Sequence, residues 1–113
     1  MKDLVVKTLD NDKAEDIVDI NLSGKTSIAD HMVICTGRSS RQVIALAENL
    51  SETLNKNGYK SRLEGCDTGD WVILDAGDII VHVFRPEVRE FYKLEKMWGV
   101  DFNPSDHNLY LSA

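Results

Sequence analysis

The sequence predicts an α/β domain in which helices pack on a compact mixed β-sheet. Two observations support this fold class. Short apolar runs with strand character alternate with segments whose apolar residues recur at helical spacing. The length of 113 residues, with 42% hydrophobic and 28% charged residues, is typical of one globular domain. We therefore expect a single domain over residues 1–113 with the element order α-β-β-α-(β)-β-β-α.

The first half of the chain should contain a helix and two strands. The first dozen residues show apolar side chains at helical spacing, which predicts a short helix. Residues 16–20 alternate apolar and polar side chains and predict a strand. Residues 21–27 predict a connection, and the apolar run 32–35 predicts a second strand, antiparallel to the first.

The clearest helix signal covers residues 39–57. Ser39 and Gln42 fit a capping box, in which each side chain satisfies the other's backbone N–H. Gly58 stands where a left-handed C-terminal cap belongs. The apolar stripe of this helix consists of Val43, Leu46, Ala47, Leu50 and Leu54.

The remaining elements follow from a hairpin pattern and a proline. Residues 71–74 and 79–84 predict two strands joined by a turn at 75–78. Pro86 fits the first turn of a last helix that stops at Gly99. The inner side of that helix is marked by Val88, Phe91, Leu94 or Glu95, and Trp98.

The net charge of −6 is unevenly distributed. Residues 25–62 hold six Lys or Arg against three acids, whereas residues 63–84 hold five acids and no Lys or Arg. These acids are Glu64, Asp67, Asp70, Asp75 and Asp78. Such a block repels phosphates, so direct nucleic-acid contact should be minor, and it suits a basic protein partner. The alternative is an ordinary solvated rim of loops.

The compartment can also be predicted. No apolar run approaches the ~20 residues that span a membrane. The N-terminus lacks a long apolar core and carries acids early, unlike a secretory signal or an Arg-rich transit peptide. Cys35 and Cys66 form no C-x-x-C pair and should be reduced and structural. We therefore expect a cytoplasmic protein without a membrane partner.

His82 lies inside an apolar strand and raises the question of catalysis. Residues 80, 82 and 84 share one strand face, and residues 79, 81 and 83 share the other. A histidine in this setting is more often structural or interfacial than catalytic. A general base needs a substrate proton within reach and a group that orients it. Asp75 or Asp78 would supply the second requirement, but the sequence shows no nucleophile.

Two other motifs fail the spacing that their chemistry needs. The Gly-Lys-Thr in residues 23–27 matches the end of a P-loop, but Asp19 stands where the first glycine is required. Candidate metal ligands are scattered without close-spaced pairs: His31, Cys35, Cys66, His82 and His107. We therefore expect neither a metal nor a cofactor.

Residues 35–40 combine a strand, a Gly/Ser turn and a helix N-terminus. This layout can hold an anion, and it also opens the nucleotidyltransferase fold. Those enzymes need carboxylates at D-x-D spacing to hold Mg²⁺, and none follows the helix. The layout therefore fits a nucleotidyltransferase-like core without its catalytic motif. A degenerate enzyme that binds nucleotide at 37–40 is the alternative, and a capped helix start is the simplest interpretation.

Several short motifs occur in a specific joint order. They are Gly37-x-Ser39-x-Arg41-Gln42-Val43, Gly58-Tyr59, Glu64-Gly65, Trp71-x-x-x-Asp75-x-Gly77-Asp78-Ile79-Ile80-Val81-His82-Val83-Phe84, and Glu87-x-Arg89-x-Phe91-Tyr92-x-Leu94-Glu95-x-Met97-Trp98. Together they resemble the ribosomal silencing factor family, also called Iojap-like, over nearly the whole chain. Ala76 and Met97 depart mildly from the aromatic residue and the leucine that are common there.

This resemblance implies a function. Family members bind the large ribosomal subunit through its basic protein numbered fourteen. They sterically block joining of the small subunit and so repress translation under nutrient limitation. Their fold is similar to the nucleotidyltransferase core without its catalytic motif, which implies a non-enzyme.

The resemblance and the charge pattern together suggest a contact surface. The residues expected on or beside it are Asp70, Trp71, Asp75, Asp78, His82 and Tyr92. An exposed aromatic flanked by acids offers an anchor and complementary charge to a basic partner. The alternative for Trp71 is a core residue that starts a strand. An interaction module without a ribosomal partner is the second rival, and a homodimer follows if an apolar sheet edge is uncovered.

Overall fold

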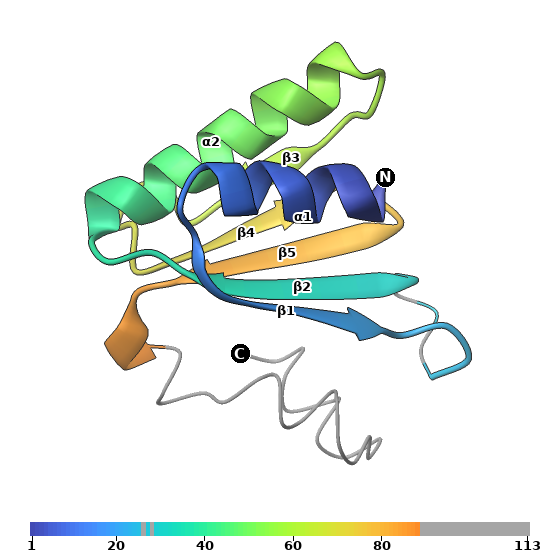
Figure 1. Ribbon diagram of the computed structural model, residues 1–113, viewed down its shortest axis with the longest axis horizontal. Helices are drawn as coiled ribbons and strands as arrows, with labels where there is room; N and C mark the ends of the chain where they lie inside the picture. The colour runs from blue at the N-terminus through green and yellow to red at the C-terminus, as the bar shows by residue number, and fades with distance from the viewer. Residues whose placement is uncertain (26, 28, 89–113) are drawn as a thin grey trace.

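A five-stranded mixed sheet forms the centre of the molecule (Figure 1). The computed structural model describes residues 1–25, 27 and 29–88. Its elements are α1 (Lys2–Asn11), β1 (Glu15–Asn21), β2 (His31–Thr36), α2 (Ser40–Lys56), β3 (Arg62–Glu64), β4 (Trp71–Asp75) and β5 (Ile79–Phe84). The predicted α/β class and the order of these elements are confirmed.

The strand order is β1-β2-β5-β4-β3. β2 and β5 pair in parallel at the centre, and the other neighbours pair antiparallel. The expected antiparallel pairing of the first two strands and the hairpin between β4 and β5 are therefore both confirmed. Gly77 adopts φ 85° in the hairpin turn, a conformation that glycine accepts without steric cost.

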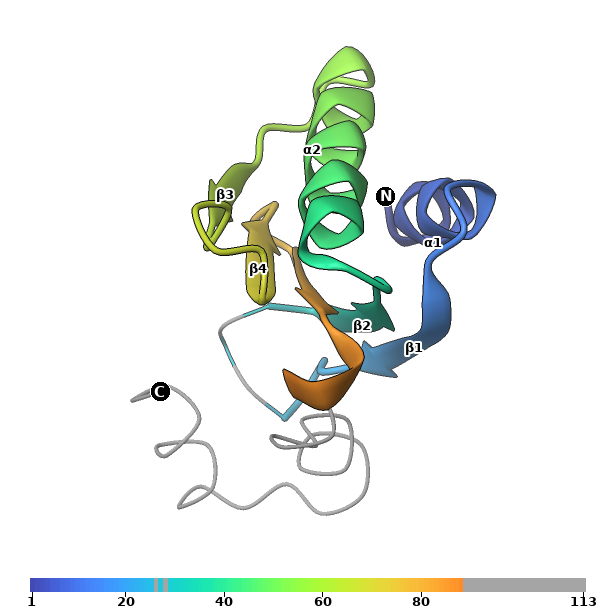
Figure 2. The same cartoon turned by 90° about the vertical axis from the view of Figure 1, so that its left-hand side faces the viewer.

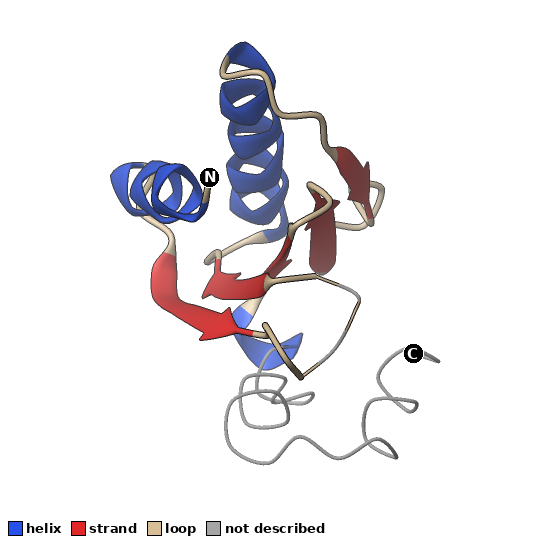
Figure 3. Ribbon diagram, turned by 90° about the vertical axis from the view of Figure 1, so that its right-hand side faces the viewer, coloured by secondary structure: helices blue, strands red, loops and turns tan. Residues whose placement is uncertain are grey.

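Helices α1 and α2 cover the same face of the sheet (Figures 2 and 3). The predicted stripe of α2 is buried there against Val72, Leu74, Val81 and Val83. Val5 and Leu9 of α1 join the same cluster. The even and odd residues of β5 thus separate onto two faces, as the strand alternation predicted.

The opposite face carries a second, smaller apolar cluster. Its buried members are Ile20, Leu22, Met32, Ile34 and Phe84, with Val18, Trp71 and Val88 packed against them. Neither α1 nor α2 contributes to this cluster, which is built by β1, β2, the start of β4 and the end of β5, together with Leu22 just after β1 and Val88 beyond β5.

Side chains and backbone close both ends of α2. Ser39 Oγ accepts a hydrogen bond from the Gln42 N–H at 3.1 Å, as the capping box predicts. The reciprocal bond differs, because Gln42 Oε1 accepts from the N–H of Arg38, one residue before the cap, at 2.6 Å. At the other end, Gly58 adopts φ 86° and the N–H of Tyr59 donates to the carbonyl of Leu54, a Schellman arrangement.

The last predicted helix begins inside the described residues. Residues 86–88 are helical, and the N–H of Val88 donates to the carbonyl of Arg85. The rest of that helix, including Tyr92, lies outside the described residues. No disulfide joins Cys35 and Cys66. Among the described helices, none is long and apolar enough to cross a membrane.

Candidate partner-binding site

The β4–β5 hairpin carries five of the six predicted contact residues, but at separate places. Asp70 and Trp71 lie where β4 begins, whereas Asp75 and Asp78 flank the hairpin turn. Five residues of extended chain separate Asp70 from Asp75 by about 16 Å. The structure therefore splits the predicted site into two ends of one hairpin, with His82 between them.

An aromatic group occupies the first end. Trp71 is half-buried and lies directly opposite Phe84, with ring centroids 4.9 Å apart. His82 stacks on Phe84 at 5.9 Å with an interplanar angle of 9°. The indole N–H of Trp71 donates to His82 Nδ1 at 2.9 Å. Trp71 is thus neither a core tryptophan nor a freely exposed one, because one side packs on the second cluster.

The environment of His82 argues against acid–base chemistry. Its side chain is only 1% exposed, and burial lowers the pKa of the imidazole to about 3. Because His82 Nδ1 accepts the hydrogen bond from the indole N–H, the proton of the neutral imidazole is on Nε2. A ring so weakly basic is a poor proton acceptor at neutral pH. These observations favour the structural interpretation, with His82 lying beneath the surface that Trp71 reaches.

Arg85 balances the acid at this end. Its Nη1 lies 3.3 Å from Asp70 Oδ1, and its backbone N–H donates to the Asp70 carbonyl at 3.0 Å. Arg85 also pairs with Glu87. Asp70 is therefore compensated, although its own block of residues 63–84 holds no Lys or Arg. Strand pairing brings a cation from just beyond the block to its side.

The turn end is more open. Asp75 Oδ1 accepts from the Gly77 N–H at 2.9 Å, and its other oxygen lies 3.5 Å from Arg62 Nη2. Asp75 is therefore compensated too, again by an arginine outside the acidic block. Asp78 is exposed, and its carbonyl accepts from the N–H groups of Asp30 and His31. Within the described part of the chain, no ion pair involves the Asp78 carboxylate.

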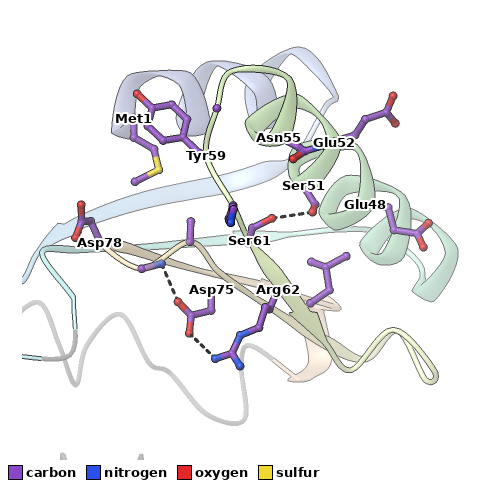
Figure 4. Close-up of a pocket in the computed structure, with 15 residues that line it drawn as sticks. Met1, Glu48, Ser51, Glu52, Asn55, Tyr59, Ser61, Arg62, Asp75 and Asp78 are labelled. Carbon is purple, nitrogen blue, oxygen red and sulfur yellow. Dashed lines mark hydrogen bonds and ion pairs between the residues drawn. The ribbon is translucent and has the colours of Figure 1, made fainter.

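A groove of about 1110 Å³ lies beside this turn (Figure 4). Its walls are the C-terminal half of α2, residues 58–63 and the turn itself. Tyr59 lines it and is 37% exposed, and Ser51 and Ser61 join its walls through a 2.7 Å hydrogen bond. The distribution of charge along the sequence does not indicate this groove, although the Gly58-Tyr59 motif and the helix stop place an aromatic residue there.

A strip on the face away from the helices connects the two ends. Trp71, Ile73 and Asp75 share this face of β4, because alternate residues of a strand point the same way. Ile73 and Ile80 line a small hollow between them and are only partly buried. We define the contact strip as Trp71, Ile73, Asp75 and Ile80; Asp70 stands at its end, where its carboxylate meets Arg85 beside the first residue of α2, Ser40. The two isoleucines were not predicted, because apolar strand residues normally indicate core.

The turn at residues 37–40 packs against the start of α2. A Cβ on Gly37 would lie 2.8 Å from Val43 Cγ2, so the turn packs closely on α2. The N–H groups of Gly37, Arg38 and Gln42 donate to Phe84, Gln42 and Ser39, and so are already used within the protein. This geometry favours the capped helix start over the anion site.

Comparison with known proteins identifies the family. The model of the family described as ribosomal silencing factor during starvation matches residues 1–110. The chain belongs to the ribosomal silencing factor family. It is 59% identical over 97 residues to the ribosomal silencing factor of Zymomonas mobilis, covering 85% of this chain and 73% of that one. It is 46% identical over 98 residues to that of Haemophilus influenzae, covering 86% and 96%.

A solved structure has the same fold. The crystal structure of a protein from Chromobacterium violaceum superposes with a TM-score of 0.85 at 38% identity, covering 90% of this chain and 86% of that one. More distant relatives confirm the Iojap-like resemblance. They include the mouse protein named for mitochondrial assembly of the ribosomal large subunit, 33% identical over 85% of this chain and 44% of its own. The chloroplastic Iojap of maize is 33% identical over 59% of this chain and 29% of its own.

Proposed function

We propose that this protein silences translation by occupying the large ribosomal subunit in the cytoplasm and blocking the joining of the small subunit. The observation that carries the proposal is family membership over residues 1–110. The name of the mouse relative, which refers to assembly of the large subunit, supports the choice of subunit. The direct partner is the basic protein numbered fourteen, and no chemical step on the ribosome is required.

The contact strip offers the chemistry that a basic partner needs. Trp71 presents a large amphipathic ring, of the kind enriched at the energetic centres of interfaces. Asp70 directly precedes Trp71, Asp75 ends the same strand and Asp78 lies in the turn. A standard interface of about 800 Å² per partner is roughly 30 Å across, so both ends of the hairpin fit inside one footprint. Steric block then follows from binding alone.

Competition with subunit joining sets the affinity that is needed. A Kd near or below ~1 μM, about −8 kcal/mol, is required at micromolar protein concentrations. Co-sedimentation with separately purified large and small subunits tests this directly. We expect saturable binding to the large subunit and none to the small one. Equal binding to both subunits, or to neither, would contradict the proposal.

Self-association is a separate question with its own measurement. β1 and β3 are the two edges of the sheet, and an edge can pair with a second copy of the chain. Analytical ultracentrifugation over a range of concentrations distinguishes a monomer from the homodimer that such pairing would give.

A further inference from the structure

The hydrogen bond between Trp71 and His82 joins side chains that are not opposite each other. In the register of the hairpin, Trp71 faces Phe84, and His82 faces Ile73. The indole therefore leans along the sheet toward its centre to reach a diagonal neighbour, with ring centroids 5.8 Å apart and tilted by 42°. A tryptophan at the end of a strand could adopt several rotamers, and this bond favours one of them.

The acceptor is well suited to hold this orientation. The indole N–H is a donor only, so a half-buried indole needs an acceptor at a defined place. His82 Nδ1 provides it at 2.9 Å from a ring that is itself stacked on Phe84. Burial lowers the pKa of His82 to about 3, so the ring stays neutral and Nδ1 keeps its lone pair throughout the physiological range.

We propose that His82 is a positioning residue that holds the Trp71 indole in the orientation in which it meets the ribosomal partner. This inference depends on the proposed function, because Trp71 must be a contact residue. His82 itself is buried and does not touch the partner. Its effect is to order the anchor before binding, so that less rotamer freedom is lost when the complex forms.

Three substitutions separate positioning from packing. His82→Phe keeps a ring and removes the acceptor, and His82→Leu removes both. His82→Asn restores an acceptor oxygen close to the place of Nδ1. Hydrogen exchange of the Trp71 indole N–H, assigned by its loss in Trp71→Phe, reports the bond without any ribosome. We expect slow exchange in the wild type and His82→Asn, and fast exchange in the other two variants.

Binding to the large subunit by co-sedimentation gives the second readout. We expect His82→Phe and His82→Leu to bind roughly fivefold to tenfold more weakly than the wild type, and His82→Asn to bind nearly as well. In a Trp71→Phe background, His82→Phe should cause no further loss, because its effect passes through the indole. Thermal unfolding identifies any variant that fails to fold. If either His82→Phe or His82→Leu fails to fold, the other still tests the effect of removing the acceptor.

Each contrary result has a distinct meaning. Equal loss with and without the Trp71 indole would overturn positioning and leave His82 as packing. Fast indole exchange together with unchanged large-subunit binding in His82→Phe and His82→Leu would also overturn the positioning role. Unchanged binding by Trp71→Phe would overturn both the contact and its positioning. Failure of the wild type to bind the large subunit would instead contradict the proposed function, while indole exchange would still report the hydrogen bond.

Discussion

The two ends of the β4–β5 hairpin both carry acids but differ in what surrounds them. At the start of β4, Asp70 stands beside an indole that is packed on Phe84 and bonded to a buried histidine. At the turn, Asp75 and Asp78 border an open groove, and Asp75 accepts from the turn backbone and pairs with Arg62. The first end can supply a rigid anchor, whereas the second can supply charge. In protein interfaces, packed aromatic anchors contribute much of the affinity, whereas complementary charges mainly raise the encounter rate.

The largest expected effect is a loss of stability in acid that comes from the burial of neutral His82 at the first end. Its pKa is about 3 in the folded protein and near 6.5 in the unfolded chain, so the unfolded chain binds more protons between these values. The contribution of His82 to the free energy of unfolding is fully present above pH ~6.5. It falls by about 1.4 kcal/mol per pH unit toward pH 3. At pH 4.5 the wild type should lose about 3 kcal/mol from this source.

Urea unfolding at pH 7 and 4.5 measures this loss. His82→Asn is the matched control, because it cannot titrate while all carboxylates remain. We expect the wild type to lose more stability than the variant over this interval. Parallel losses in the two proteins would show that His82 is readily protonated in the folded state.

Removing the anchor should have the next largest effect. Trp71→Ala should weaken large-subunit binding by about 2 kcal/mol or more, roughly thirtyfold, because hot-spot residues at interface centres cost this much. Tyr59→Ala removes the exposed aromatic of the groove and is the matched control. Co-sedimentation should show a large loss for the first variant and little for the second. The reverse pattern would place the anchor in the groove.

Charge reversal tests the contribution that both ends share. Replacing Asp70, Asp75 and Asp78 by lysine should weaken binding roughly tenfold, about 1.4 kcal/mol. Wild-type binding should also weaken as salt rises, since rim charges are screened over ~10 Å at 0.1 M. Reversal of Asp3 and Asp10, exposed on α1, is the control. Equal binding by the two reversed proteins would identify the hairpin acids as ordinary solvated surface.

The same reversal should change stability only slightly. Asp70 and Asp75 each lose an arginine partner, and an exposed pair contributes about 0–1 kcal/mol. Asp75 also loses its bond to the Gly77 N–H, which water can replace because the turn is exposed. Circular dichroism should therefore show a thermal midpoint a few degrees lower at most. A large drop would mean that these pairs stabilise the hairpin and would confound the binding result.

The fold could be predicted because its signals are local. Strand alternation, the α2 stripe and the Gly58 stop each lie within a few residues, and each is confirmed by the structure. The site could be predicted only in part, because its contacts depend on register. Arg85 lies fifteen positions from Asp70, and only strand pairing makes them neighbours. The bond from Trp71 to His82 depends on a diagonal lean that residue spacing does not encode.

Light scattering of mixed ribosomal subunits measures directly whether this protein blocks their joining. The protein is incubated with large subunits at saturating concentration before small subunits are added, with Trp71→Ala at the same concentration as the control. We expect the wild type to slow joining and lower its final extent, and the variant to leave joining close to that of untreated subunits. Unchanged joining at a concentration where co-sedimentation shows the large subunit to be saturated would contradict the proposed function.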